Sequence, residues 1–168
     1  HCKSYPEAYR VRKATVKIYK SLEEFRGVKN PVVTIGTFDG VHIGHQKIIQ
    51  KMKKEAARID GETVLVTFDP HPRLVIHADS KNLKFINTRK KKFERLEKAG
   101  IDHLIVIPFN REFSKTTSHE FIRNIIVDKI HAKKLIIGYD HHFGKNRLGD
   151  FNELYDLGQK YGFSVAKV

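Results

Sequence analysis

Two histidines, His42 and His45, lie three residues apart in a glycine-rich stretch that is suited to binding an anion. Residues 36–45 read Gly-Thr-Phe-Asp-Gly-Val-His-Ile-Gly-His and directly follow an apolar run at 32–35. A helix is predicted to begin where this stretch ends, so its free N–H groups and positive dipole end would face the loop. Glycines permit close backbone approach, and each imidazole can donate to a phosphate oxygen. The stretch therefore predicts a phosphate-binding loop for phosphoryl or nucleotidyl transfer, which needs positioning and charge stabilisation.

Two other interpretations use the same histidines. A helix N-terminus can carry two histidines incidentally, and histidines at positions i and i+3 can bind zinc. Asp39 is the one further metal-binding side chain nearby in the sequence, so a phosphate is favoured and no metal ligand is assigned. The stretch is not a Walker P-loop, because it lacks Gly-Lys-Ser/Thr.

A second group of candidate residues follows the apolar run at 63–68. Residues 67–73 read Thr-Phe-Asp-Pro-His-Pro-Arg, and the two prolines stiffen the backbone. Phe68 offers an aromatic face, and His71 and Arg73 offer hydrogen-bond donors, which together suit a flat aromatic ligand with a phosphate. An ordinary proline-stiffened loop explains the same residues, and physical reasoning alone does not decide between these alternatives.

A third stretch, residues 138–150, is rich in glycine and positive charge. Lys145 and Arg147 can reach a phosphate, and Phe143 can flank a purine. The alternative for its adjacent histidines, at 141 and 142, is a solvated pair of loop residues, and this alternative is preferred for His141.

Apolar runs alternate with helix-period segments along most of the chain, which predicts a Rossmann-like α/β fold with a parallel sheet of about five strands flanked by helices. The predicted strands are 32–35, 63–68, 103–107, 135–137 and 163–168. The predicted helices are 45–58, a segment capped by Thr88 and ended by Gly100, a segment from the Thr117–Glu120 capping box to Ile130, and 150–161. Two weaker patterns suggest a strand within 14–19 and a short helix from Ser21 to Phe25 with Glu24 in its capping box. Ligands of such sheets bind at the carboxyl ends of the strands, where all three loops would lie.

With these motifs in place, the chain resembles the nucleotidyltransferases with a His-x-Gly-His signature, and more narrowly the bacterial bifunctional riboflavin kinase/FMN adenylyltransferase family. The resemblance runs from about Val16 to Val168. It implies transfer of AMP from ATP to FMN, giving FAD and pyrophosphate, with Mg²⁺ accompanying ATP. It assigns His42 and His45 to the triphosphate and the departing pyrophosphate. ATP-binding positions would be Gly36, Thr37, Phe38, Gly44, Asp140, Phe143, Gly144 and Lys145, and flavin-binding positions Phe68, His71, Pro72 and Arg73.

The chain departs from this family pattern in three places. Residues 1–13 match nothing in the family and are interpreted as a tail or foreign extension before a domain at 14–168. Lys91 replaces the usual glutamate, which would remove the capping-box partner of Thr88 and cost about 1 kcal/mol of stability. The family continues past the equivalent of Val168 with a Ser-Ser-Thr-x-x-Arg-like motif and a riboflavin kinase domain, so we expect a fragment that binds better than it turns over.

Composition is typical of one globular domain: 168 residues, 40% hydrophobic and 30% charged. The single cysteine excludes an intrachain disulfide, and no signal-peptide or membrane-helix pattern appears, so a cytoplasmic protein is expected. The net charge of +13 is compatible with a nucleic-acid-binding module. Because the lysines are spread over several predicted helices, we interpret them as solvated faces and expect neither a nucleic acid nor a membrane as partner. The other enzymatic alternative, a cytidylyltransferase of the same superfamily, lacks the Pro-His-Pro-Arg loop.

Overall fold

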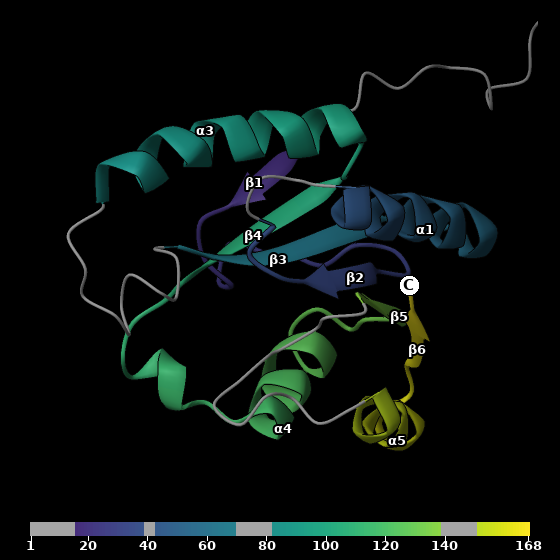
Figure 1. Cartoon of the computed structure of the whole chain (residues 1–168). Coiled ribbons are helices and arrows are strands. Elements are labelled where there is room, and N and C mark those ends of the chain that lie inside the picture. The colour runs from purple at the N-terminus through teal and green to yellow at the C-terminus, as the bar shows by residue number, and fades with distance from the viewer. Residues whose placement is uncertain (1–15, 39–42, 70–81, 139–150) are drawn as a thin grey trace, which may run out of the picture.

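The fold is a single parallel sheet with helices on both faces, as the computed structural model shows for residues 16–38, 43–69, 82–138 and 151–168 (Figure 1). The six strands are β1 (Lys17–Tyr19), β2 (Val32–Ile35), β3 (Thr63–Asp69), β4 (His103–Pro108), β5 (Lys134–Ile137) and β6 (Ser164–Lys167). Their spatial order is β1-β4-β3-β2-β5-β6, and every neighbouring pair is parallel. The predicted fold class is confirmed, and the weakly patterned segment before Ser21 supplies a sixth strand at the edge.

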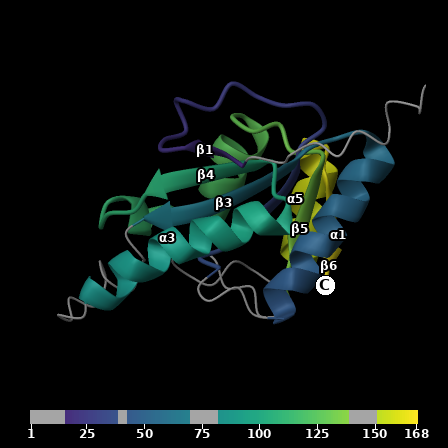
Figure 2. The same cartoon turned by 90° about the horizontal axis from the view of Figure 1, so that it is seen from above.

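Helices α1 (Ile43–Ile59) and α3 (Asn82–Ala99) cover one face of the sheet (Figures 1 and 2). The other face is covered by α4 (Ser118–Phe121), the π-helical segment η3 (Ile122–Val127) and α5 (Phe151–Tyr161), with a short 3-10 turn, η2 (Phe113–Lys115), between β4 and α4 (Figure 1). In the described part of the chain, no helix combines the length and apolarity that a membrane crossing requires.

The core divides into two layers because successive residues of a strand point to opposite faces. Val64, Val66 and Phe68 of β3 belong to the layer under α4 and α5, whereas Leu65 belongs to the layer under α1 and α3. The central strands are buried on both faces, which explains why they read as continuous apolar runs in the sequence.

The starts of α4 and α3 test two of the caps that the sequence predicted. The capping box at the start of α4 is confirmed in its first half, since Thr117 Oγ1 accepts a hydrogen bond from the Glu120 N–H at 3.2 Å. The predicted cap at Thr88 is wrong, because α3 begins at Asn82 and Thr88 lies inside it. The stability penalty assigned to Lys91 is therefore wrong as well.

The predicted helix from Ser21 to Phe25 is also absent. Residues 20–24 form bends and turns, and the Glu24 carboxylate accepts a hydrogen bond from the Lys20 N–H at 3.0 Å. The acidic side chain thus closes a turn, without a helix following it directly.

Candidate active site

The sheet reverses its winding direction at β2, where the candidate site begins. From β2 the chain passes through α1 to β3 on one side, while from β5, the neighbour of β2 on the other side, it passes through α5 to β6. In open α/β sheets, ligands bind at the carboxyl ends of the strands at such a switch point. The loops that begin at Gly36 and Gly138 follow these two strands, and the loop after Asp69 follows the adjacent β3.

At their carboxyl ends, β2 and β5 are joined by a side chain. Backbone pairing between them is recorded for Val32 with Lys134 and for Val33 with Leu135, and both strands run two residues further. There the Thr34 hydroxyl donates to the Ile136 carbonyl at 2.8 Å. The buried hydroxyl therefore connects the two strands from which the predicted phosphate and nucleotide loops start.

The first loop places its aromatic residue beneath the start of α1. Phe38 has a left-handed backbone (φ +52°) and is only 3% exposed. Its ring lies against the ring of His45, with centroids 4.6 Å apart, and an added Cβ on Gly36 would lie 2.9 Å from the Phe38 ring. Glycine at position 36 thus permits Phe38 to fold back into the core and to support His45 from below.

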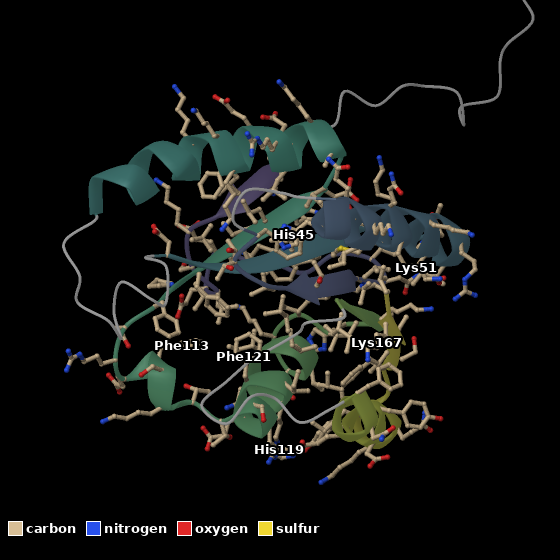
Figure 3. All side chains as sticks on the ribbon, in the orientation of Figure 1. His45, Lys51, Phe113, His119, Phe121 and Lys167 are labelled. Carbon is tan, nitrogen blue, oxygen red and sulfur yellow. The ribbon has the colours of Figure 1, made fainter. Side chains whose placement is uncertain are left out.

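His45 lies in the first turn of α1 and is half-buried on the α1 side of the sheet (Figure 3). This is where a helix leaves backbone N–H groups without intrahelical acceptors and where its dipole attracts negative charge. His45 therefore lies in the turn of α1 that attracts negative charge, and its contact with a phosphate stays a prediction.

The loop after β5 starts close to α1. An added Cβ on Gly138 would lie 2.9 Å from Cδ1 of Ile48, one turn along α1 from His45. The Phe38 ring of the first loop and the beginning of the third loop consequently lie against the same turn of α1.

Phe68, whose ring was expected to face a ligand, is buried near the end of β3. Its ring is 8% exposed and packs against Phe109, Phe113 and Phe121, with centroid distances of 5.8, 5.9 and 6.2 Å. Figure 3 shows Phe113 and Phe121 on the α4 side of the sheet, opposite His45. This burial gives Phe68 a packing role under the second loop, and its contact with a flavin stays a prediction.

The structure describes Gly36, Thr37, Phe38, Gly44, His45 and Phe68 from the predicted site. Outside the described residues lie His42, His71, Pro72, Arg73, Asp140, Phe143, Gly144 and Lys145. In the described ranges, no three His, Cys, Asp or Glu side chains come together as a metal site would need.

Sequence reasoning missed two residues at this edge, Thr67 and Lys92. The Lys92 ammonium donates to the Thr67 hydroxyl at 2.9 Å, and this hydroxyl lies 3.5 Å from the carbonyl oxygen of Thr37. A signal was available, because Lys92 is four residues before the buried Leu96 and so lies on the same face of α3.

Ionised groups with perturbed pKa values lie away from this edge. Hydrogen bonds from Lys134, Arg58 and Lys51, together with the charge of Lys134, lower the pKa of Glu55 to about 2 against the opposing effect of burial. Asp60, through a hydrogen bond and its charge, raises the pKa of Lys29. Since Lys134 is the first residue of β5, the Glu55 cluster connects the last turns of α1 to the amino end of the sheet.

Comparison with known proteins supports the interpretation of the motifs. The FAD synthetase family model matches residues 26–168. The bifunctional riboflavin kinase/FMN adenylyltransferase of Buchnera aphidicola (Acyrthosiphon pisum) is 33% identical over 154 residues, covering 91% of this chain and 49% of the relative. The Escherichia coli K12 protein of the same description is 34% identical over 135 residues, covering 80% and 43%.

A solved structure from Streptococcus pneumoniae, described as a macrolide-efflux protein, superposes with a TM-score of 0.74 at 22% identity, covering 92% of this chain and 51% of that one. This likeness concerns the fold alone. The chain spans about half the length of the curated relatives it matches. Because the family model covers nearly all of the sequence, including the three loops at the carboxyl edge, the chain belongs to the FAD synthetase family.

Proposed function

We propose that this chain transfers AMP from ATP to FMN, as the adenylyltransferase part of a longer protein. An FMN phosphate oxygen attacks the α-phosphorus of ATP, the bond from that phosphorus to the bridging oxygen breaks, and pyrophosphate leaves. The observation that carries the proposal is the glycine-rich loop at the switch point, which ends in the first turn of α1 with His45 supported by Phe38. Both substrates are intracellular metabolites, so the proposal implies a cytoplasmic location.

The roles of the residues follow from charge. In this transfer, negative charge grows on the oxygens of the departing pyrophosphate, so donors already in place lower the barrier. His45 and the N-terminus of α1 supply such donors, and His42 would add a second imidazole from the same loop. Mg²⁺ bound to ATP would neutralise part of the triphosphate charge when present.

The flavin side would be the loop after β3. Its start is held by the aromatic packing of Phe68, so that His71, Pro72 and Arg73 follow a fixed strand end next to the phosphate loop. Neighbouring β2 and β3 thereby offer a donor side and an acceptor side at one edge of the sheet.

The test uses the complete protein with His45→Ala and His42→Ala, and His119→Ala on α4 as a matched control because His119 is exposed on the opposite face. FAD formation should fall by on the order of 10²-fold in the two loop variants, with FMN affinity little changed. The control should keep its rate, and thermal unfolding checks that each variant is folded. Near-normal turnover in both loop variants would contradict the proposal, and turnover with CTP and a non-flavin phosphate would favour a cytidylyltransferase.

A further inference from the structure

One lysine in a run of three turns away from solvent at the carboxyl edge of the sheet. Lys90 and Lys91 are exposed on α3, whereas Lys92 is half-buried and donates to Thr67 Oγ1 at 2.9 Å. Thr67 is 1% exposed and lies two residues before the end of β3. The long lysine stem thus brings a positive charge from a helix on the face of the sheet to the end of a central strand.

The Thr67 hydroxyl that accepts from Lys92 also lies close to the phosphate loop. A hydroxyl can accept one hydrogen bond while it donates another. Thr67 accepts from Lys92 and reaches the Thr37 carbonyl at 3.5 Å, the outer limit for such a bond. Thr37 directly precedes Phe38, whose ring supports His45. A connected set of contacts therefore runs from α3 through the end of β3 to the loop after β2.

These contacts join the two sides of the proposed reaction. The loop after β2 would hold the triphosphate, and the loop after β3 would hold the acceptor. In-line transfer needs the attacking oxygen and the α-phosphorus in a near-attack arrangement, and a misplacement of about 1 Å can cost on the order of 10²-fold in rate. A hydrogen bond from an ammonium is stronger than one between neutral groups, which suits it to holding this spacing.

We infer that Lys92 is a positioning residue for adenylyl transfer, a role that rests on the proposed function: through Thr67 it fixes the spacing between the phosphate loop and the acceptor loop. In this role Lys92 acts through Thr67 and not directly on the reacting atoms. The turnover number should therefore fall while each substrate, which contacts mainly one loop, keeps most of its affinity.

The experiment compares variants of the complete protein. Lys92→Met keeps the apolar stem of the side chain and removes its charge. Thr67→Val keeps the shape and removes the hydroxyl, whereas Thr67→Ser keeps the hydroxyl and removes the methyl group. Lys91→Met is the matched control, because it removes one exposed positive charge from the adjacent position of α3. Steady-state FAD formation gives kcat, and calorimetry gives the affinities for ATP and FMN separately.

We expect Lys92→Met and Thr67→Val each to lower kcat by on the order of 10-fold or more, with smaller changes in both affinities. The double variant should be no slower than the worse single variant, since both remove one connection. Thr67→Ser should regain most of the rate, and Lys91→Met should match the wild type. Unchanged kcat in Lys92→Met, or an equal loss in Lys91→Met, would overturn the inference.

A second measurement does not depend on catalysis. Hydrogen exchange of the backbone amides at 36–38 and 67–69 should speed up in Lys92→Met and not in Lys91→Met, while the urea midpoint reports global stability. Faster exchange in both segments supports the connection even if the wild type forms no FAD. Absence of FAD formation by the wild type would refute the proposed function and the positioning role in it. Unchanged exchange in both segments overturns the connection whatever the wild type catalyses.

Discussion

The cluster around Glu55 makes a quantitative prediction about stability. The Glu55 side chain is 8% exposed, and its carboxylate lies 2.9 Å from Lys134 Nζ, 2.8 Å from an Arg58 nitrogen and 3.3 Å from Lys51 Nζ. We predict that Glu55→Gln, which keeps the shape and removes the charge, lowers the free energy of unfolding at pH 7. The loss arises because three cations lose their shared anion and Lys134 is left largely buried.

The size of the loss follows from the pKa of Glu55. A fall from 4.5 to about 2 corresponds to at most about 3–4 kcal/mol, at 1.36 kcal/mol per pKa unit. Arg58 is 64% exposed, so solvent screens part of its interaction with Glu55. We therefore expect Glu55→Gln to lower the free energy of unfolding by about 1–3 kcal/mol. Urea denaturation would measure this loss as a lower midpoint at an unchanged slope.

The pH dependence distinguishes this cause from a packing defect. Because the folded pKa is depressed, the contribution of Glu55 is complete above the unfolded pKa of about 4.5 and is lost as the pH falls toward 2. The difference between wild type and Glu55→Gln should therefore shrink between about pH 5 and pH 2. Glu94→Gln, on the exposed surface of α3, is the control and should leave stability nearly unchanged at all pH values. A difference for Glu55→Gln that stays constant down to pH 2 would refute the electrostatic explanation.

Two further predictions concern the flavin loop and α5. His71→Ala should weaken FMN more than ATP in calorimetry, because His71 follows β3 on the proposed acceptor side; equal losses for both ligands would show that this loop is not the flavin side. Gly158→Ala should destabilise the chain in thermal unfolding although alanine favours helices, because the new Cβ would lie 2.4 Å from the backbone oxygen of Phe163. A raised midpoint for this variant would mean that the end of α5 shifts easily.

The strands were predictable because burial leaves a simple signal. β2 was predicted at its observed bounds, and β3, β4 and β5 to within one residue at either end, since strands covered on both faces are short, continuous apolar runs. β1 was weakly patterned because it lies at the sheet edge, where one of its three side chains is buried.

Helix starts were less predictable, because several residue types fit both a cap and a helix interior. Thr88 precedes the apolar positions Phe93 and Leu96, which made it look like a cap, yet α3 extends six residues further toward its amino end. Ser21 and Glu24 have the spacing of a capping box, yet residues 20–24 form a turn and no helix follows them directly. The π-helical η3 has no sequence signal of its own, since it differs from an α-helix by one residue in its hydrogen bonding, as between the Asp128 N–H and the Arg123 carbonyl.

The position of the candidate site could be predicted from the sequence, whereas the contacts of its side chains could not. Alternating strands and helices bring the strand ends to one edge, so the order of elements alone placed the first loop beside the start of α1. Which side chains point inward depends on packing. The resemblance assigned Phe38 to ATP, and Phe68 was assigned to the flavin for its aromatic face. The fold buries both rings, one under His45 and one among other phenylalanines.

In the part of the chain that the structure describes, the two edges of the sheet use different interactions. At the amino edge, Glu55 and its cations join α1 to β5, and the Asp102 carboxylate accepts hydrogen bonds from both the N–H and the hydroxyl of Thr63 at 2.9 and 3.1 Å. At the carboxyl edge, the described contacts include a glycine that admits a ring, hydroxyls that connect neighbouring strands and loops, and the Lys92 ammonium on Thr67. Helix α1 contributes to both edges, because its last turns carry the Glu55 cluster and its first turn carries His45 and the positive end of the dipole. Under the proposed function, a phosphate would bind at the first turn of α1 while the Glu55 cluster stabilises the opposite end of the same helix.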